Sequence, residues 1–310
     1  MTTRSALPLL LIEAFAPTLH RGNGATVVAL EAPVSSAWMQ AVAASLKQSE
    51  TAFVLPWGDG WAIRWFTPTC EVALCGHATL AATLALGHWG SLKPGESTVF
   101  QSRSGPLPVS LAAHVPGAAA GPLATIQLPT FPLEPIATLP ALEAPLQQAL
   151  GRAPEQVWSS SLGYTVALVE DRVDLRALDG FAEKVPEPCR GGLVVMQAMP
   201  PSAGPESAIE GRPADYQLRF FAPGLGIPED PVTGSAHALV APYWLQRLTQ
   251  GQVRGWQASA RGGGLVCEPA EPGSIRLRGP GQILLEGKLA WQEQSCDPES
   301  WAQRFPATSG

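Results

Sequence analysis

A short pattern occurs twice in this chain, about half the chain length apart. In the first copy the segment Arg64–Pro68 (RWFTP) precedes Gly76 and an apolar run, and in the second copy Arg219–Pro223 (RFFAP) precedes Gly234 and another apolar run. Each copy is typical of a strand, a turn that contains proline, and a helix that begins with small residues. Because solenoid repeats have periods of only ~20–50 residues, a repeat at half-length predicts two related domains.

The starts of the two predicted helices indicate a function. A helix that begins at Gly76 or Gly234 among small residues offers backbone N–H groups at its positive dipole end, and such an end suits an anion. If the two halves face each other, both helix starts would bind one anionic ligand. The net charge of −6 means that these local dipoles must attract the anion against the field of the whole chain.

The predicted elements belong to the α+β class. The helices that begin at Gly76 and Gly234 are apolar nearly all round at their starts, as buried helices are. Further helices are expected over residues 35–48 and 144–150, and strands over residues 9–14, 25–30, 61–66, 98–102, 124–128, 164–169, 193–197, 216–221, 264–267 and 283–285. We therefore expect two pseudo-symmetric domains, residues 1–118 and 119–285, each a bent, mostly antiparallel sheet or barrel around a central helix.

Composition excludes several classes of protein. The hydrophobic fraction of 45% in 310 residues is sufficient for a core in each domain, and the chain has no basic run that would indicate nucleic-acid binding. The apolar run Ala6–Ile12 is too short to span a membrane, and no other segment approaches that length. Five scattered cysteines, at positions 70, 75, 189, 267 and 296, argue against a disulfide framework. A reducing compartment, the cytoplasm, is expected.

Three segments together resemble the phenazine-biosynthesis PhzF family, which is similar in turn to the diaminopimelate epimerases. They are SETAFV at residues 49–54, RWFTP with Glu71 and CGHAT at residues 64–79, and EDPVTGSAH at residues 229–237. Gly22-Asn23-Gly24 is similar to a Gly-Asn-Pro segment of the family, with glycine where proline is usual. The resemblance implies the diaminopimelate epimerase-like fold, with the segment from about residue 286 to 310 crossing back to the first domain. A homodimer is left open as the assembly.

The resemblance also implies a cofactor-independent isomerase in which Glu50 moves the proton. From its position alone, between a predicted helix and an apolar strand, partial desolvation would raise the pKa of Glu50 toward acid/base use. His77 is expected to be neutral, because it stands at a helix N-terminus, which disfavours the imidazolium. The resemblance makes His77 and Asp230 catalytic cleft residues, although Asp230 could instead cap the second helix. Gly76, Gly234 and Ser235 are expected to bind a small anionic metabolite.

Cys75 raises an alternative activity. In the related epimerases and proline racemases a cysteine precedes this glycine in both halves, and the two thiols act on opposite faces of the substrate. Here Thr233 takes the second place, and its hydroxyl is too weakly acidic to replace a thiol. An amino-acid or hydroxy-acid epimerase is therefore the less favoured reading, with Cys75 a small buried residue. A metabolite-binding protein without turnover is a further alternative.

Metal and nucleotide sites are not expected. Cys70, Cys75 and His77 do not have the spacing of a closed zinc set, and Arg261-Gly262-Gly263-Gly264 lacks the Lys-Ser/Thr ending of a phosphate loop. Whether Gln257 or Arg261 contributes to the site is left open. The natural substrate is not specified by these residues.

Overall fold

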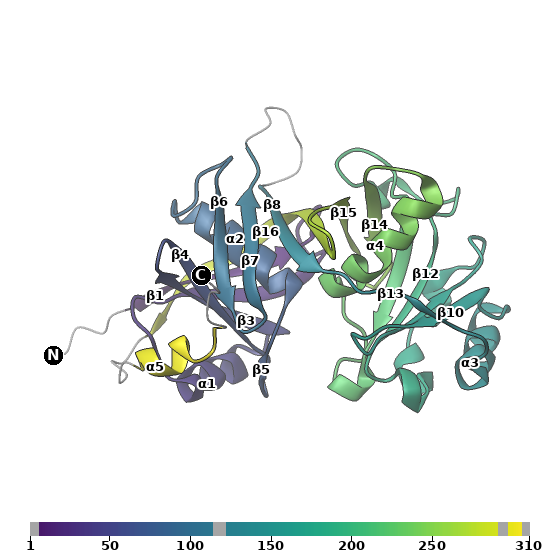
Figure 1. Ribbon diagram of the computed structural model, residues 1–310, viewed down its shortest axis with the longest axis horizontal. Coiled ribbons are helices and arrows are strands. Elements are labelled where there is room, and N and C mark those ends of the chain that lie inside the picture. Colours follow the sequence, from purple (N-terminus) through teal and green to yellow (C-terminus); the bar gives the residue numbers. More distant parts are fainter. Residues whose placement is uncertain (1–5, 114–121, 291–296, 306–310) are drawn as a thin grey trace. The chain divides into compact units, whose positions relative to one another are not determined.

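The computed structural model describes residues 6–113, 122–290 and 297–305. It divides into two compact units (Figure 1). The first consists of residues 1–20, 24–127 and 278–310, and the second of residues 21–23 and 128–277. The expected boundary at residues 118/119 lies outside the described residues. The units divide at residues 277/278, and not near 285/286 as expected. This division falls inside the long strand β16 (Ser274–Ala290), which takes part in both units.

The strands of the first unit close into an eight-stranded barrel. Their order is β1-β2-β3-β4-β6-β7-β8-β16, and β1 pairs with β16 to complete the ring. The bounds are β1 Ala6–Ala14, β2 Asn23–Ala29, β3 Glu50–Trp57, β4 Gly60–Phe66, β6 Ser97–Ser102, β7 Gly105–Leu111 and β8 Leu123–Pro129, with a short β5, Glu71–Val72, beside β4.

Helix α2 (Gly76–His88) is the central helix of the first unit (Figure 1). It packs against β1, β3 and β7, and every residue from Gly76 to Leu86 is buried. Thr79 and Thr83 remain satisfied in this apolar setting because each hydroxyl donates to the carbonyl four residues earlier. The apolar composition of α2 is therefore explained by burial on all sides.

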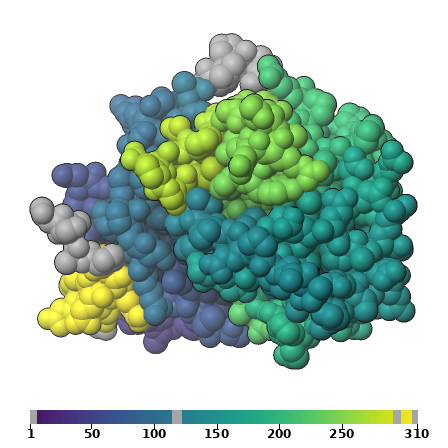
Figure 2. Space-filling model, turned by 45° about the vertical axis from the view of Figure 1, so that its right-hand side comes forward, coloured from purple at the N-terminus to yellow at the C-terminus, as the bar shows by residue number. Residues whose placement is uncertain are grey.

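Two further helices cover the first unit from outside. Helix α1 (Ser36–Leu46) begins after Ser35, whose hydroxyl accepts from the Trp38 amide, and it packs on β3 and β4. Helix α5 (Pro298–Ala302) lies at the surface, where Figure 2 shows it in yellow, but its Trp301 is fully buried. The Trp301 indole donates to the carbonyl of Val34, so the C-terminal segment contributes to the core of the first unit.

The second unit has the same succession of strands. Its order is β16-β15-β14-β13-β12-β11-β10-β9. The bounds are β9 Glu134–Ile136, β10 Gln156–Ser159, β11 Thr165–Leu168, β12 Leu193–Ala198, β13 Tyr216–Phe221, β14 Val253–Gln257 and β15 Gly263–Pro269. Helix α4 (Gly234–Leu248) packs on β14 and β15.

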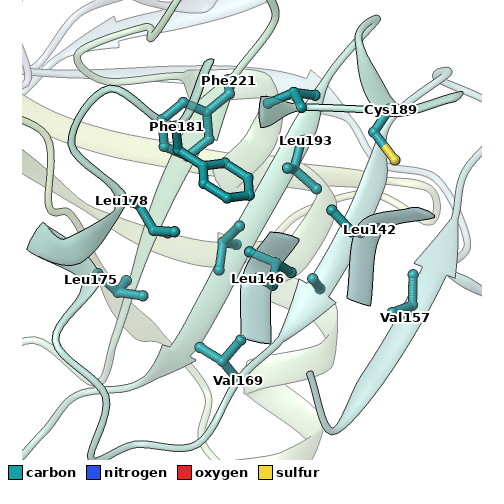
Figure 3. Close-up of a cluster of buried hydrophobic side chains, with 13 residues drawn as sticks. Leu142, Leu146, Val157, Val169, Leu175, Leu178, Phe181, Cys189, Leu193 and Phe221 are labelled. Atoms are coloured by element: carbon teal, nitrogen blue, oxygen red, sulfur yellow. The ribbon is translucent and has the colours of Figure 1, made fainter. Parts of the chain in front are cut away.

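A second core lies between the sheet of this unit and its outer segments (Figure 3). Leu142 and Leu146 of helix α3 (Pro140–Leu150) pack there with Phe181 and Phe221. Short 3-10 turns also occur in this unit; η1 Leu175–Leu178, η2 Phe181–Lys184 and η3 Glu187–Cys189 contribute to this core, and the others are η4 Pro205–Ser207 and η5 Pro223–Leu225. These turns were not expected from the sequence, since none is long enough to have a hydrophobic period.

Strand pairing confirms the expected repeat. In the first unit β2 and β3 are parallel, β3 and β4 antiparallel, and β4 and β6 parallel. In the second unit β11 and β12 are parallel, β12 and β13 antiparallel, and β13 and β14 parallel. The central helix follows β4 in one unit and β13 in the other. The expected α+β class, with two pseudo-symmetric and mostly antiparallel domains, is confirmed.

Candidate active site

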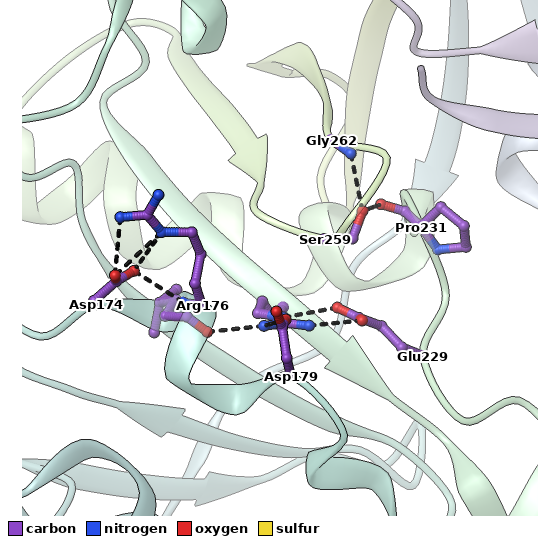
Figure 4. Close-up of polar contacts among 9 residues, drawn as sticks. Asp174, Arg176, Asp179, Glu229, Pro231, Ser259 and Gly262 are labelled. Carbon is purple, nitrogen blue, oxygen red and sulfur yellow. Dashed lines mark hydrogen bonds and ion pairs between the residues drawn. The ribbon is translucent and has the colours of Figure 1, made fainter. Parts of the chain in front are cut away.

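The arginine of each sequence repeat is buried and forms the same ion pair with a partly exposed glutamate. Arg64 donates through Nε and Nη2 to the two carboxylate oxygens of Glu71, at 2.8 and 2.9 Å. Arg219 pairs in the same way with Glu229, at 2.7 Å for both contacts (Figure 4). Each guanidinium also lies 5.3 Å from the ring of the phenylalanine two residues later, because residues i and i+2 share one face of a strand.

Each ion pair lies just before the segment that leads into a central helix. The residue that precedes the helix is Cys75 in the first unit and Thr233 in the second, and each follows the paired glutamate by the same four-residue step. Neither residue caps its helix through a side-chain hydrogen bond. The residue before each helix therefore makes no side-chain cap hydrogen bond to the first-turn N–H groups, which suits an anion site.

In the first unit, three buried side chains meet at the start of α2. Glu50, the first residue of β3, places Oε2 3.1 Å from Nε2 of His77. The Cys75 sulfur lies 3.5 Å from Nδ1 of the same ring. Ser49 donates to the carbonyl of Gly24 and lies 3.2 Å from Nε2 of His77. The side chains of Glu50 and His77 are only 10% and 6% exposed, so their interaction is screened little by water.

The charges at this cluster differ from those expected. Burial alone would raise the pKa of Glu50, but the charge and hydrogen bond of His77 outweigh burial and hold that pKa below its usual value. Burial alone would lower the pKa of His77, whereas Cys75 and then Glu50 raise it well above 6.5 through charge and hydrogen bonds, and Glu50 is the one of the two that is ionised at neutral pH. The expected raised pKa of Glu50 and the expected neutral His77 are therefore both wrong. The helix N-terminus disfavours an imidazolium, but the carboxylate 3.1 Å away is the stronger influence.

The environment of Cys75 does not favour its thiolate form. Burial, followed by the charge of Glu50, raises the pKa of its thiol. A thiol that stays protonated at neutral pH is a weak nucleophile and a weak base. Its position agrees with the expectation of a small buried residue before the helix.

In the second unit, Asp230 is held at the start of α4 by a network of neutral groups. Its Oδ1 accepts from the Asn23 amide at 2.7 Å, and its Oδ2 accepts from the Thr233 hydroxyl at 2.5 Å. Gln257 accepts from the Thr233 backbone N–H at 2.7 Å and donates to the Asp230 carbonyl at 2.6 Å. The N-cap residue of α4 is Thr233, and the Asp230 carboxylate contacts the side chain of this threonine before the helix.

The two residues whose contribution was left open support this network. Gln257 bridges the segment that carries Asp230, as just described. Arg261 donates to the carbonyls of Gly22 at 2.8 Å and Arg21 at 3.1 Å, and so fixes the segment that presents Asn23. Ser259 ties the same loop to the carbonyl of Pro231 and to the Gly262 amide (Figure 4).

Ser235 contacts a residue that sequence reasoning missed. The Tyr164 hydroxyl lies 3.1 Å from Oγ of Ser235 in the first turn of α4. Tyr164 directly precedes β11 and packs on Phe220 at 4.9 Å between ring centroids. A tyrosine beside a turn gives no signal in sequence alone; only the pairing of β11 and β12 brings it to the helix start.

Register identifies the counterpart of Glu50 in the second unit. Thr51 pairs with Phe66 as Leu193 pairs with Phe221, and the two phenylalanines are equivalent in the sequence repeat. Glu50 therefore corresponds to Gly192. A side chain there would have its Cβ only 2.3 Å from the Tyr164 ring, which occupies the space beside that glycine. The acid of the first unit has no counterpart in the second.

No helix among residues 6–113, 122–290 and 297–305 is both long enough and apolar enough to cross a membrane.

Comparison with known proteins gives the family. Residues 12–287 match the family model described as phenazine biosynthesis-like protein, PhzC-PhzF. A Pseudomonas aeruginosa protein named an uncharacterized isomerase is 37% identical over 279 residues, covering 90% of this chain and 96% of that protein. The crystal structure of a PhzF family protein from Enterococcus faecalis has 31% identity and a TM-score of 0.75, covering 93% of this chain and 100% of the other.

A more distant likeness concerns the fold alone. The crystal structure of a hydroxyproline epimerase from Agrobacterium vitis has 12% identity and a TM-score of 0.57, covering 98% of this chain and 99% of the other. The family model and the Pseudomonas aeruginosa relative both match most of the chain. This chain belongs to the phenazine biosynthesis-like (PhzC-PhzF) protein family.

Proposed function

We propose that this chain is a cofactor-independent isomerase that moves a proton between two positions of a small carboxylate-bearing substrate. Relatives over nearly the whole chain are named isomerases, which supports an enzyme of the isomerase or epimerase class. The single observation that carries the finer proposal is the buried pair formed by Glu50 and His77 at the start of α2.

Glu50 takes the proton from carbon and returns it. Its lowered pKa makes it a carboxylate at neutral pH, as a base must be. Its burial removes the water that would otherwise solvate the carboxylate. A positioned acid or base contributes ~10²–10⁴ to the rate of a proton transfer.

His77 stabilises the negative charge that forms on the substrate. Once Glu50 has accepted the proton it is neutral, and the anionic intermediate replaces it as the negative partner of the positively charged His77. The positive charge of His77, which had balanced the Glu50 carboxylate, then faces the anionic intermediate at the N-terminus of α2. A fixed positive charge in a buried place stabilises a developing anion without reorganisation of water.

The N–H groups at Gly76 and Gly234 bind the carboxylate group of the substrate. Support comes from the missing side-chain caps of both helices. Asp230 and Ser235 orient a hydroxyl or amine of the substrate, because each already has a fixed polar partner and keeps oxygen lone pairs.

The differences between the two units favour an isomerase over a two-base epimerase. The first unit carries the glutamate, whereas the second has Gly192 at the corresponding place, covered by Tyr164. The position of Cys75 is taken by Thr233, whose hydroxyl donates to Asp230. One strong acid/base residue in one unit suits removal and return of a proton by the same group.

The test is hydrogen exchange in heavy water with a panel of linear and cyclic carboxylates. We expect deuterium to be incorporated at carbon only when Glu50 is present. The configuration of any stereocentre should be retained, and a double bond or a proton should have moved to a new position. Inversion of configuration would favour the epimerase. Carboxylates that bind, seen by calorimetry, yet exchange no proton under any condition would instead support a binding protein and overturn the proposal.

A further inference from the structure

Glu50, Cys75 and His77 have the chemistry of a metal-binding set. They offer a carboxylate oxygen, a sulfur and an imidazole nitrogen, and these three atoms lie within 4.8 Å of one another with all three residues buried. The sequence did not indicate this set, because the spacing argument had grouped Cys75 and His77 with Cys70. Cys70 is exposed and its sulfur contacts Thr67 instead.

Two of the distances between the ligand atoms are close to those around a tetrahedral ion. Zinc bonds of ~2.0–2.1 Å to nitrogen and oxygen and ~2.3 Å to sulfur require edges of about 3.3 Å between nitrogen and oxygen and about 3.6 Å between nitrogen and sulfur. Nε2 of His77 lies 3.1 Å from Oε2 of Glu50 and 3.9 Å from the Cys75 sulfur. The sulfur lies nearer to Nδ1 of the same ring, at 3.5 Å, so the Cys75 side chain has to turn toward Nε2 to form the site.

We propose that Glu50 Oε2, Cys75 Sγ and His77 Nε2 bind a zinc ion, with the fourth coordination position open. Imidazole and thiolate select zinc over magnesium and calcium, which prefer sets of oxygen ligands. The ion replaces the proton on Nε2 of His77 and the proton of the Cys75 thiol. The carboxylate offsets the unfavourable positive end of α2.

Zinc in this site inhibits the enzyme. A carboxylate that coordinates zinc cannot take a proton from carbon, and His77 then carries no proton of its own at Nε2. This part rests on the proposed function, whereas metal binding itself does not. The chain would thus be an isomerase whose acid/base pair is blocked by a thiophilic divalent cation and restored by a chelator.

The binding test uses the whole chain without substrate, at mildly alkaline pH, because cysteine and histidine bind metals in their deprotonated forms. Zinc affinity is measured by competition with a chromophoric chelator, and Co²⁺ is added as a spectroscopic probe. We expect one equivalent of Co²⁺ with tetrahedral d–d bands and a sulfur-to-cobalt charge-transfer band. Cys75→Ala should weaken zinc binding more than ~100-fold, beyond the usual effect of losing a group that only supports a ligand.

Cys70→Ala is the matched control, since it removes an exposed thiol near the same helix start and should leave zinc affinity unchanged. Thermal unfolding of each variant shows whether it is folded. Equal zinc affinity of the parent and a folded Cys75→Ala variant would overturn the proposal, as would a cobalt spectrum without the sulfur band.

The inhibition test measures deuterium exchange, with each variant compared with its own chelator-treated rate. We expect stoichiometric zinc to suppress exchange in the parent, and Cys75→Ala to need more than ~100-fold more zinc for the same suppression. Exchange by an enzyme that binds no zinc would refute only the metal site. Tight zinc binding by a chain that exchanges no substrate after chelation would refute only the proposed function.

Discussion

Replacing Glu50 with glutamine tests the proposed chemistry and the charge of His77 together. Glutamine keeps the shape of the side chain but has neither the charge nor the ability to carry the proton. Opposite charges 3.1 Å apart attract by about 5 kcal/mol at an effective dielectric constant of 20. At neutral pH, where the Cys75 thiol is uncharged, this attraction is what opposes the burial of His77, so without it burial and the helix N-terminus act in the same direction.

We therefore expect the pKa of His77 to fall below 6.5 in Glu50→Gln, from well above that value in the parent. Deuterium exchange should fall by ~10²–10⁴. Because the uncharged imidazole tolerates burial, unfolding should become easier by much less than the ~3–5 kcal/mol typical of breaking a buried ion pair.

The assay follows the imidazole resonances of His77 by NMR across a pH titration, beside exchange rates and urea unfolding of the same samples. His77→Gln serves to assign the resonance. An unchanged His77 pKa in folded Glu50→Gln would refute the ion-pair argument. Near-normal exchange by this variant would refute the assignment of Glu50 as the acid/base.

The remaining predictions concern pH, the second unit and metals. The lowered pKa of Glu50 makes its stabilisation disappear as pH falls through its folded value, and the raised pKa of His77 makes its stabilisation disappear as pH rises through its own folded value. The difference in unfolding free energy between the parent and Glu50→Gln, measured with urea, should therefore be largest at pH values that lie between the folded pKa of Glu50 and that of His77. Arg219→Ala should lower the free energy of unfolding by about 1.5–3 kcal/mol, since the half-buried Glu229 loses its charged hydrogen-bond donor, whereas Arg176→Ala at the surface should have no measurable effect. Gly192→Ala should displace the Tyr164 ring and weaken carboxylate binding in calorimetry; unchanged affinity would contradict the close packing of that ring. Dialysis against a chelator should leave deuterium exchange intact or raise it, and loss of exchange that zinc restores would show that the reaction needs a metal.

The sequence by itself determined the repeat and most of the elements that build it. The helices beginning at Gly76 and Gly234 start where expected, because small residues, a preceding proline turn and an apolar run are local signals. It also indicated Glu50, His77 and Asp230, through the resemblance of their segments to a known family. Strands β5, β7, β9, β10 and β14 were missed, since short strands near glycine and proline have too little alternation to be recognised.

Tertiary structure alone decided which groups meet and which charges they carry. The pKa of Glu50 depends on burial and on a histidine that follows it by 27 positions, and those two influences have opposite signs. Local sequence supplied burial and the helix dipole but not the distance between the two side chains, so both expected charge states were wrong. In the same way, Gly192 is recognised as the counterpart of Glu50 only through strand register, because hydrogen bonding between strands aligns residues that have no sequence similarity.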